Sequence, residues 1–389
     1  MIDYNRVLSR TVVDLPKSGI RKFFDLLENM NDVVSLTVGQ PDFVTPWHIR
    51  EAGIESLQKG KTYYTSNAGT RELREEIARY FARRFSLSYL PEETIATVGG
   101  SEAIDLAIRA VVEPGDEVII PTPSFVCYEP IVRMTGGVPV ILTTRAEDRF
   151  KLTPDALRAA ITPHTKMLVL PFPSNPTGAI MTREELAEIA DILRNTDIVV
   201  LSDEIYAELT YGRKHTSIAA LPDMKERTVL VNGFSKAFAM TGWRLGMLAA
   251  PKPLIEQMLK IHQYAIMCAP TTSQLAAVEA LRNGDGDIES MVAEYDRRRL
   301  YIYNGLRDIG MDSFEPEGAF YIFPDIRPFG LSSDEFCNRL LYDYKCALVP
   351  GNAFGACGEG FARVSYAYSV KHLSMALERI EAFLKTLKK

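Results

Sequence analysis

Between residues 94 and 250, short apolar runs alternate with amphipathic stretches of helical period. Strand and helix in this order predict an α/β fold, a mostly parallel sheet covered by helices on both faces. The expected strands are residues 94–98, 117–121, 139–142, 166–170, 198–202, 228–232 and 245–249, and the expected helices are 101–112, 153–160 and 183–193. The last helix should begin with a capping box, because Glu185 follows Thr182 by three residues.

The pattern changes after about residue 285. A charged helix is expected at residues 287–308, strands at 320–323 and 363–366, and an amphipathic helix at 370–387. A chain of 389 residues is long for one compact core, so a second, smaller α+β domain is expected here.

Charge and composition exclude several classes of protein. With 44 Lys and Arg against 50 Asp and Glu, the net charge of −6 argues against a nucleic-acid binder. No apolar run approaches the length of a membrane span, and the N-terminus has an early acid, Asp3, and no signal-peptide core. The five cysteines form no CxxC pair and the five histidines are scattered, so we expect reduced thiols, no metal site and a cytoplasmic protein.

Polar and glycine-rich segments follow the expected strands. Because ligands bind beyond the carboxyl ends of strands in open α/β sheets, these segments should meet at one rim. They are Gly99-Gly100-Ser101, Pro123-Ser124-Phe125, Asn175-Pro176-Thr177-Gly178, Asp203-Glu204-Ile205-Tyr206 and Ser235-Lys236. Gly100 and Ser101 precede a helix, which suits either a phosphate cradle or an ordinary serine N-cap.

Lys236 follows a strand within a run of small residues, and Arg244 stands eight positions later. Most lysines are solvated surface charges, but an amine held at the carboxyl end of a strand can form an imine with an aldehyde. Pyridoxal 5'-phosphate (PLP) is the aldehyde cofactor that proteins hold in this way, and an arginine can bind its phosphate. Residues 233–246 resemble the lysine-attachment pattern of the PLP-dependent class I/II aminotransferases (fold type I, aspartate aminotransferase-like), and the resemblance extends over the rest of the chain.

The resemblance implies a role for each residue of the rim. It places Lys236 on the PLP aldehyde and Asp203 on the ring nitrogen, which a carboxylate keeps protonated. Without the resemblance, Asp203 would be interpreted as a helix cap and Phe125 as a core residue. Asn175 before Pro176 would be interpreted as a turn, with a trans or a cis peptide bond. The other implied cofactor contacts are Gly100, Ser101, Ser235 and Arg244 at the phosphate, Tyr206 and Asn175 at the phenolic oxygen, and Phe125 on the ring face.

Segments outside the sheet complete the site that the resemblance implies. Gly39, in a hinge loop, approaches the substrate, and Arg363 binds its α-carboxylate together with Asn175, a task suited to a guanidinium fork. Tyr64 matches a tyrosine that reaches the phosphate of a neighbouring subunit, which implies a homodimer with shared active sites. The implied domains are residues 43–285, which bind PLP, and residues 1–42 with 286–389.

The predicted activity is ping-pong transfer of an amino group between an L-amino acid and a 2-oxo acid. The resemblance leaves aspartate, aromatic and N-acetyl-diaminopimelate types open. One aspartate subgroup carries lysine at the position of Ser101, which weakens the first type, and Gly233 replaces a serine found in some relatives. Phe320 and Tyr321 would line an apolar pocket or belong to the core.

Parts of the sequence also suit three alternative functions. The nearest is a PLP-dependent C–S β-lyase on the same scaffold, which would use the same lysine. A dinucleotide oxidoreductase lacks the expected G-x-G-x-x-G after a first strand. A regulator fused to a DNA-binding module would need additional N-terminal sequence.

Overall fold

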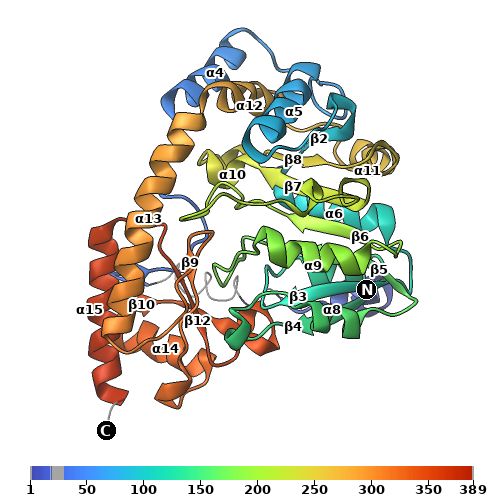
Figure 1. Cartoon of the computed structure of the whole chain (residues 1–389). Helices are drawn as coiled ribbons and strands as arrows, with labels where there is room; N and C mark the ends of the chain where they lie inside the picture. Colours follow the sequence, from blue (N-terminus) through green and yellow to red (C-terminus); the bar gives the residue numbers. More distant parts are fainter. Residues whose placement is uncertain (1, 18, 20–29, 388–389) are drawn as a thin grey trace.

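The computed structural model describes residues 2–17, 19 and 30–387. A seven-stranded sheet lies at its centre, in the order β2-β8-β7-β6-β5-β3-β4 (Figure 1). The strands are β2 (Thr94–Thr97), β3 (Glu117–Thr122), β4 (Val138–Thr143), β5 (Thr165–Leu170), β6 (Val199–Asp203), β7 (Thr228–Gly233) and β8 (Gly246–Ala249). Each prediction of a strand is confirmed to within two residues, and so is the mostly parallel α/β class.

Strand β8 departs from the parallel arrangement, since it runs antiparallel to both β7 and β2. The remaining neighbours are parallel. Because β8 runs the other way, its first residue lies at the rim where β2 and β7 end. Arg244, just before β8, is therefore brought to the same rim as the segments that follow the parallel strands.

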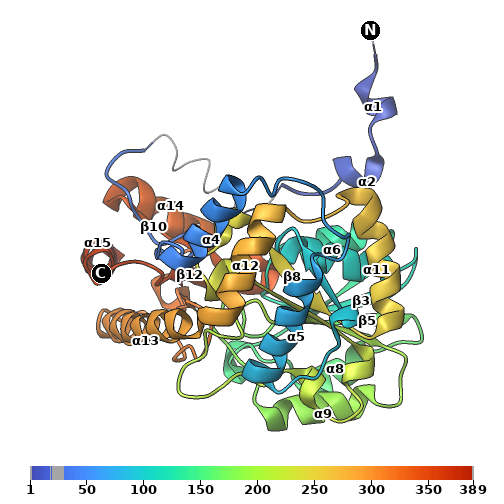
Figure 2. The same cartoon turned by 90° about the horizontal axis from the view of Figure 1, so that it is seen from above.

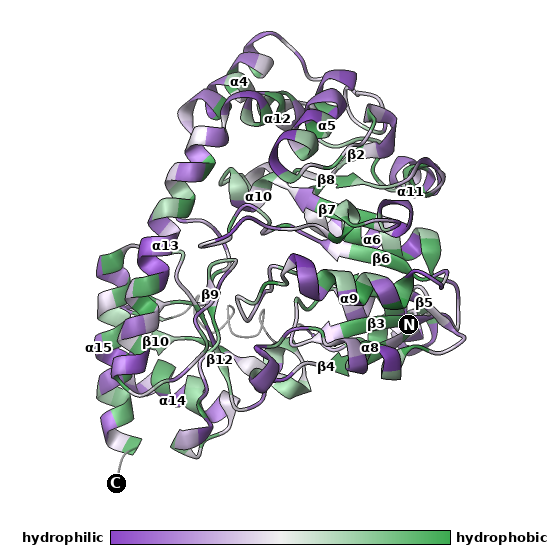
Figure 3. Ribbon diagram, in the orientation of Figure 1, coloured by the Kyte–Doolittle hydropathy of each residue, from purple (hydrophilic) through white to green (hydrophobic). Residues whose placement is uncertain are grey.

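Helices cover both faces of the sheet, because alternate side chains of each strand point to opposite faces. On β7, Val229 and Val231 pack with α6, α7 and α11, whereas Leu230 packs with α5 and α12. Strands β3, β5 and β6 pack against α8 and α9 on that second face. The helices are α4 (Trp47–Gln58), α5 (Arg71–Phe85), α6 (Gly99–Val111), α7 (Tyr128–Met134), α8 (Pro154–Ala160), α9 (Arg183–Leu193), α10 (Phe234–Ala237), α11 (Lys252–Ala265) and α12 (Thr271–Asn283). Figure 3 shows the apolar character of the strands between them.

The C-terminal third forms a second layered unit with its own core, beside the large sheet (Figure 1). Its strand β1 comes from the N-terminal segment and pairs in parallel with β10, and β11, β12 and β9 form an antiparallel sheet. The bounds are β1 (Val34–Ser35), β9 (Tyr321–Ile322), β10 (Cys346–Ala347), β11 (Val349–Pro350), β12 (Ala362–Ser365), α13 (Asp285–Asp308), α14 (Ser333–Tyr344) and α15 (Val370–Leu387). The pairing of β1 with β10 connects the N-terminal segment to the C-terminal unit, while the domain boundaries stay a prediction.

The N-terminal arm, with α1 (Tyr4–Val7) and α2 (Arg10–Val13), extends away from the body of the molecule (Figure 2). Its apolar side chains Ile2, Tyr4 and Val7 are exposed. None of the helices in the described ranges combines the length and the apolar character needed to cross a bilayer.

Candidate active site

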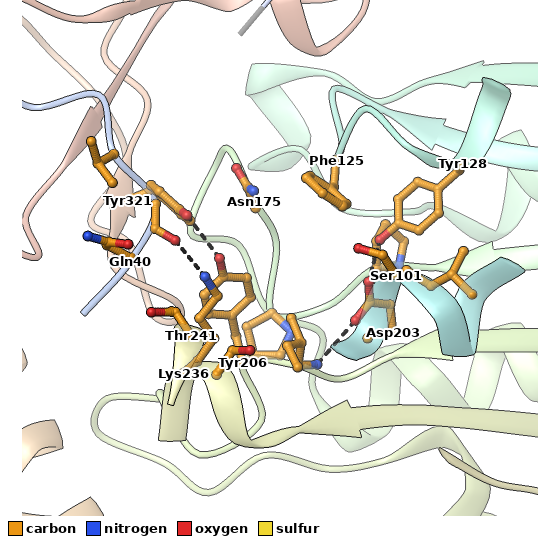
Figure 4. A pocket seen from close by; sticks show the side chains of 18 of the residues that line it. Gln40, Ser101, Phe125, Tyr128, Asn175, Asp203, Tyr206, Lys236, Thr241 and Tyr321 are labelled. Carbon is orange, nitrogen blue, oxygen red and sulfur yellow. Dashed lines mark hydrogen bonds between the residues drawn. The ribbon is translucent and has the colours of Figure 1, made fainter. Parts of the chain in front are cut away.

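A cavity of about 410 Å³ opens at the rim of the large sheet, between that sheet and the C-terminal unit. The structure brings all but one of the predicted site residues to its wall. They are Gly39, Gly100, Ser101, Phe125, Asn175, Asp203, Tyr206, Ser235, Lys236, Arg244 and Arg363. The exception is Tyr64, whose side chain is 79% exposed to solvent in the single chain. In Figure 4, Lys236, Tyr206 and Tyr321 lie on one side of the cavity, and Asp203, Ser101 and Tyr128 lie on the other.

Lys236 is carried by α10, a single turn that follows β7 directly. Its Nζ donates a hydrogen bond to the carbonyl oxygen of Gly39, which comes from the N-terminal segment. The pKa of Lys236 is lowered from 10.5 to about 8, mainly by burial and also by the nearby cations Arg363 and Arg244, while Asp203 opposes the decrease. At pH 7 about a tenth of this amine is therefore unprotonated and nucleophilic, far more than for a free lysine side chain.

Asp203, the last residue of β6, is buried, and two donors hold its carboxylate. The Tyr128 hydroxyl donates to Oδ2 at 2.7 Å, and the Ile205 N–H donates to Oδ1 at 3.2 Å. Burial raises the pKa of Asp203, and these two hydrogen bonds oppose the rise. A turn rather than a helix follows β6, and both Asp203 and Tyr206 line the cavity.

The N-terminus of α6 faces the cavity and leaves backbone N–H groups for a ligand. Gly99, the first residue of α6, has a φ of +76°, which favours glycine. A Cβ at this position would come within 2.7 Å of Nη2 of Arg244. Glu102 accepts the N–H of Val98, so the N–H groups of Gly99, Gly100 and Ser101 are the ones in the first turn that have no partner within the helix.

Arg363, on β12, is buried and fixed by several contacts. Its Nη1 donates to Oδ1 of Asn175 at 2.9 Å, and its Nη2 donates to the Thr37 carbonyl oxygen at 2.5 Å. The guanidinium carbon lies 4.5 Å from the ring centre of Tyr321 and 4.7 Å from that of Phe354. Its buried Nε has no partner in the protein, so the group keeps a donor for a ligand.

These residues fit the expected PLP. Among the described residues of the cavity wall, Asp203 is the one acid, while Lys236, Arg244 and Arg363 are cations, so the cavity favours an anionic ligand. The unpartnered Nε of Arg363 and the open helix terminus are donors that such a ligand would satisfy. No cluster of three or more metal-ligating side chains occurs in the described parts of the chain.

Sequence reasoning missed several residues of the wall. Tyr128 was not predicted, although it follows Phe125 by three residues, the spacing that places both on one side of a turn. For Phe320 and Tyr321 the sequence left open whether they line a pocket or belong to the core. Tyr321 lines the cavity, whereas Phe320 belongs to the core. Gln40 and Thr241 also reach the cavity, and no pattern in the sequence marked them.

Comparisons with known proteins show which proteins this chain is similar to. The family model for aminotransferase class I and II matches residues 31–380. A putative aminotransferase of Bacillus subtilis is 55% identical, with 97% of this chain and 98% of the relative covered. A probable N-acetyl-LL-diaminopimelate aminotransferase of the same organism is 47% identical, with 94% and 93% covered. The solved structure of an aspartate aminotransferase from Thermus thermophilus with maleate superposes with a TM-score of 0.92 at 40% identity, with 96% and 99% covered.

Proposed function

Since the chain belongs to the aminotransferase class I and II family and is an aminotransferase, we propose that it works with PLP bound covalently to Lys236. The family is generally PLP-dependent, and its reaction moves an amino group between an amino acid and a 2-oxo acid. The close relatives favour this reaction over the C–S β-lyase alternative. One observation carries the proposal: Lys236, Asp203 and Arg363 meet in one cavity from three distant parts of the chain.

When bound, PLP supplies an aldehyde that links to amines and a ring that withdraws electrons from the substrate Cα. Gly100, Ser101, Ser235 and Arg244 would hold its phosphate. Asp203 would stabilise a proton on the ring nitrogen, with its carboxylate oriented by Tyr128. Tyr206 and Asn175 would donate to the ring oxygen, and Phe125 would cover the ring face.

Arg363 would bind the α-carboxylate of the amino acid, with Asn175 beside it. This contact would hold the substrate Cα near Lys236, because the guanidinium itself is immobilised by Asn175 and Thr37. Lys236 Nζ, with its pKa near 8, would take the Cα proton as a general base and return a proton as a general acid. Such a pKa suits both directions of transfer at neutral pH.

Reduction with borohydride tests the covalent step. The proposal expects wild-type protein incubated with PLP and then reduced to carry one added cofactor on the peptide that contains Lys236. Lys236→Ala should lack the adduct, the visible absorbance and nearly all activity. Lys252→Ala, which removes an exposed lysine, is the matched control. An adduct on another side chain would contradict the proposal.

For the donor we propose an aromatic amino acid. The three cations of the cavity wall already have partners or proposed roles, so none is left to bind the side-chain carboxylate of aspartate. In addition, Ser101 stands where an aspartate subgroup is expected to carry lysine. Val38 and Tyr321 give the wall around Arg363 an apolar character. The test is a screen of aspartate, phenylalanine and N-acetyl-diaminopimelate as donors, compared by kcat/KM. A preference for aspartate would contradict this choice.

We further propose a homodimer in which Tyr64 serves the site of the partner. The exposure of Tyr64, Tyr63 and Tyr264 and of the apolar N-terminal arm supports this assembly. Mixing two inactive variants, Lys236→Ala and Tyr64→Ala, should restore activity, because hybrid dimers then contain one intact site. Failure to recover activity after subunit exchange would place Tyr64 in its own chain's site or in none.

We also propose a cytoplasmic location. All five cysteines are free in the structure, as expected of a reducing compartment. Cell fractionation tests this location.

A further inference from the structure

Tyr321 lies at a junction between the large sheet and the C-terminal unit. It belongs to β9, is 1% exposed, and presents its hydroxyl to the cavity. That hydroxyl lies 2.9 Å from the hydroxyl of Tyr206, which follows strand β6 of the large sheet (Figure 4). The two residues are 115 positions apart in the chain, so the bond connects the two units.

Two further contacts fix the ring of Tyr321. Its face lies 4.5 Å from the guanidinium carbon of Arg363. A Cβ added at Gly39 would overlap the Tyr321 hydroxyl, so the loop that accepts the hydrogen bond of Lys236 fits closely around it. Tyr321 thus touches three segments that carry predicted site residues, although the proposed mechanism gives it no task.

The direction of the hydrogen bond decides what Tyr321 does. One hydrogen lies between the two oxygens, and the more acidic phenol donates it. Burial raises the pKa of both tyrosines, but the cation of Arg363 over the ring of Tyr321 opposes the rise most directly there. Either hydroxyl could donate on geometry alone, and the contact of Arg363 with the Tyr321 ring favours Tyr321 as the donor. The hydrogen of Tyr206 is then free to point into the cavity.

We propose that Tyr321 is a positioning residue that donates to Tyr206 and so directs the Tyr206 hydrogen towards the ring oxygen of the cofactor. This inference rests on the proposed function, because it needs PLP in the cavity. The donated bond also polarises Tyr206 and makes it a better donor, as expected in a chain of hydrogen bonds.

The test is Tyr321→Phe, which keeps the ring and its contact with Arg363 and removes only the hydroxyl. The readout is the pH midpoint at which the visible absorbance of the PLP-loaded enzyme changes. A weaker donor at Tyr206 stabilises a negative ring oxygen less, so the midpoint should rise by about half a pH unit or more. The KM for the amino acid should change little, because Arg363 keeps its aromatic neighbour.

Two further variants make the test specific. Tyr211→Phe removes a buried hydroxyl that donates to the Ala319 carbonyl oxygen at 2.6 Å outside the cavity wall, so its midpoint should equal that of wild type. In a Tyr206→Phe background, Tyr321→Phe should add almost no shift, because the effect passes through Tyr206.

The outcomes separate the inference from the proposed function. An unchanged midpoint in Tyr321→Phe, or an equal shift in Tyr211→Phe, overturns the role of Tyr321 while PLP binding stands. A full additional shift in the Tyr206→Phe background also overturns it. A wild-type protein that gains no visible absorbance with PLP overturns both.

Discussion

Replacing Lys236 with methionine should stabilise the cofactor-free protein at neutral pH. The reason is that the folded chain holds the amine where its charged form is disfavoured. Its pKa is about 8 in the folded state against 10.5 for the free side chain. At about 1.4 kcal/mol per tenfold change, this difference corresponds to about 3 kcal/mol. The lost hydrogen bond to Gly39 costs about 1 kcal/mol, so the net gain should be about 2 kcal/mol.

The pH dependence follows from the same two pKa values. Above pH 10.5 the amine is neutral in both the folded and the unfolded chain, and the substitution removes no unfavourable charge. As the pH falls, the unfolded chain takes up the proton near 10.5 and the folded chain only near 8. Wild-type stability relative to Lys236→Met therefore declines across this window and stays constant below it.

The assay is urea unfolding of cofactor-free wild type and Lys236→Met at pH 7 and at pH 10.5. The midpoint of the variant should be higher at pH 7, and the gain should largely vanish at the higher pH. Lys371→Met, which replaces an exposed lysine on α15, should show no such pH-dependent gain. A variant that is less stable than wild type at pH 7, or a gain equal at both pH values, would refute the reasoning.

Three other substitutions test the site. Arg244→Gln should raise the dissociation constant for PLP by about 10- to 100-fold, measured by fluorescence titration, because it removes a charged donor from the phosphate; an unchanged constant would exclude the proposed contact. Arg363→Lys should raise the KM for the amino acid about tenfold or more and leave PLP affinity unchanged, since lysine cannot form the two-pronged contact; an equal effect on PLP affinity would contradict the assignment. Gly246→Ala should lower the free energy of unfolding by about 1–3 kcal/mol, because its Cβ would come within 2.5 Å of the Gly99 carbonyl carbon. An unchanged melting temperature would contradict this and show that the backbone at Gly99 shifts to accommodate the methyl group.

Much of the fold and of the site wall could be predicted because the relevant signals are local in the sequence. The C-terminal helix was expected at residues 370–387 and spans Val370–Leu387, since a long amphipathic period marks both ends. The capping box was also confirmed, with Thr182 and Glu185 exchanging two hydrogen bonds. Asp203 and Lys236 could be placed at the rim because each lies at or shortly after the carboxyl end of a buried strand.

Contacts between distant segments could not be predicted in this way. The bond from Tyr128 to Asp203 joins residues 75 positions apart, and the Tyr206–Tyr321 pair depends on how the two units pack. Neither Tyr128 nor Tyr321 differs in its sequence neighbourhood from an ordinary core residue. Their roles depend on side-chain orientation, which the period of a strand or helix does not specify beyond its face.

The antiparallel strand β8 shows how a reversal in topology can serve the chemistry. In a wholly parallel sheet, the residue before a strand lies at the rim opposite the ligand. Arg244 precedes β8, so a parallel β8 would place its guanidinium at the far edge, away from Lys236. Because β8 runs antiparallel between β2 and β7, the short link from α10 stays at one rim and delivers Arg244 beside Gly99. The eight-residue spacing from Lys236 to Arg244 therefore reflects a connection that never crosses the sheet.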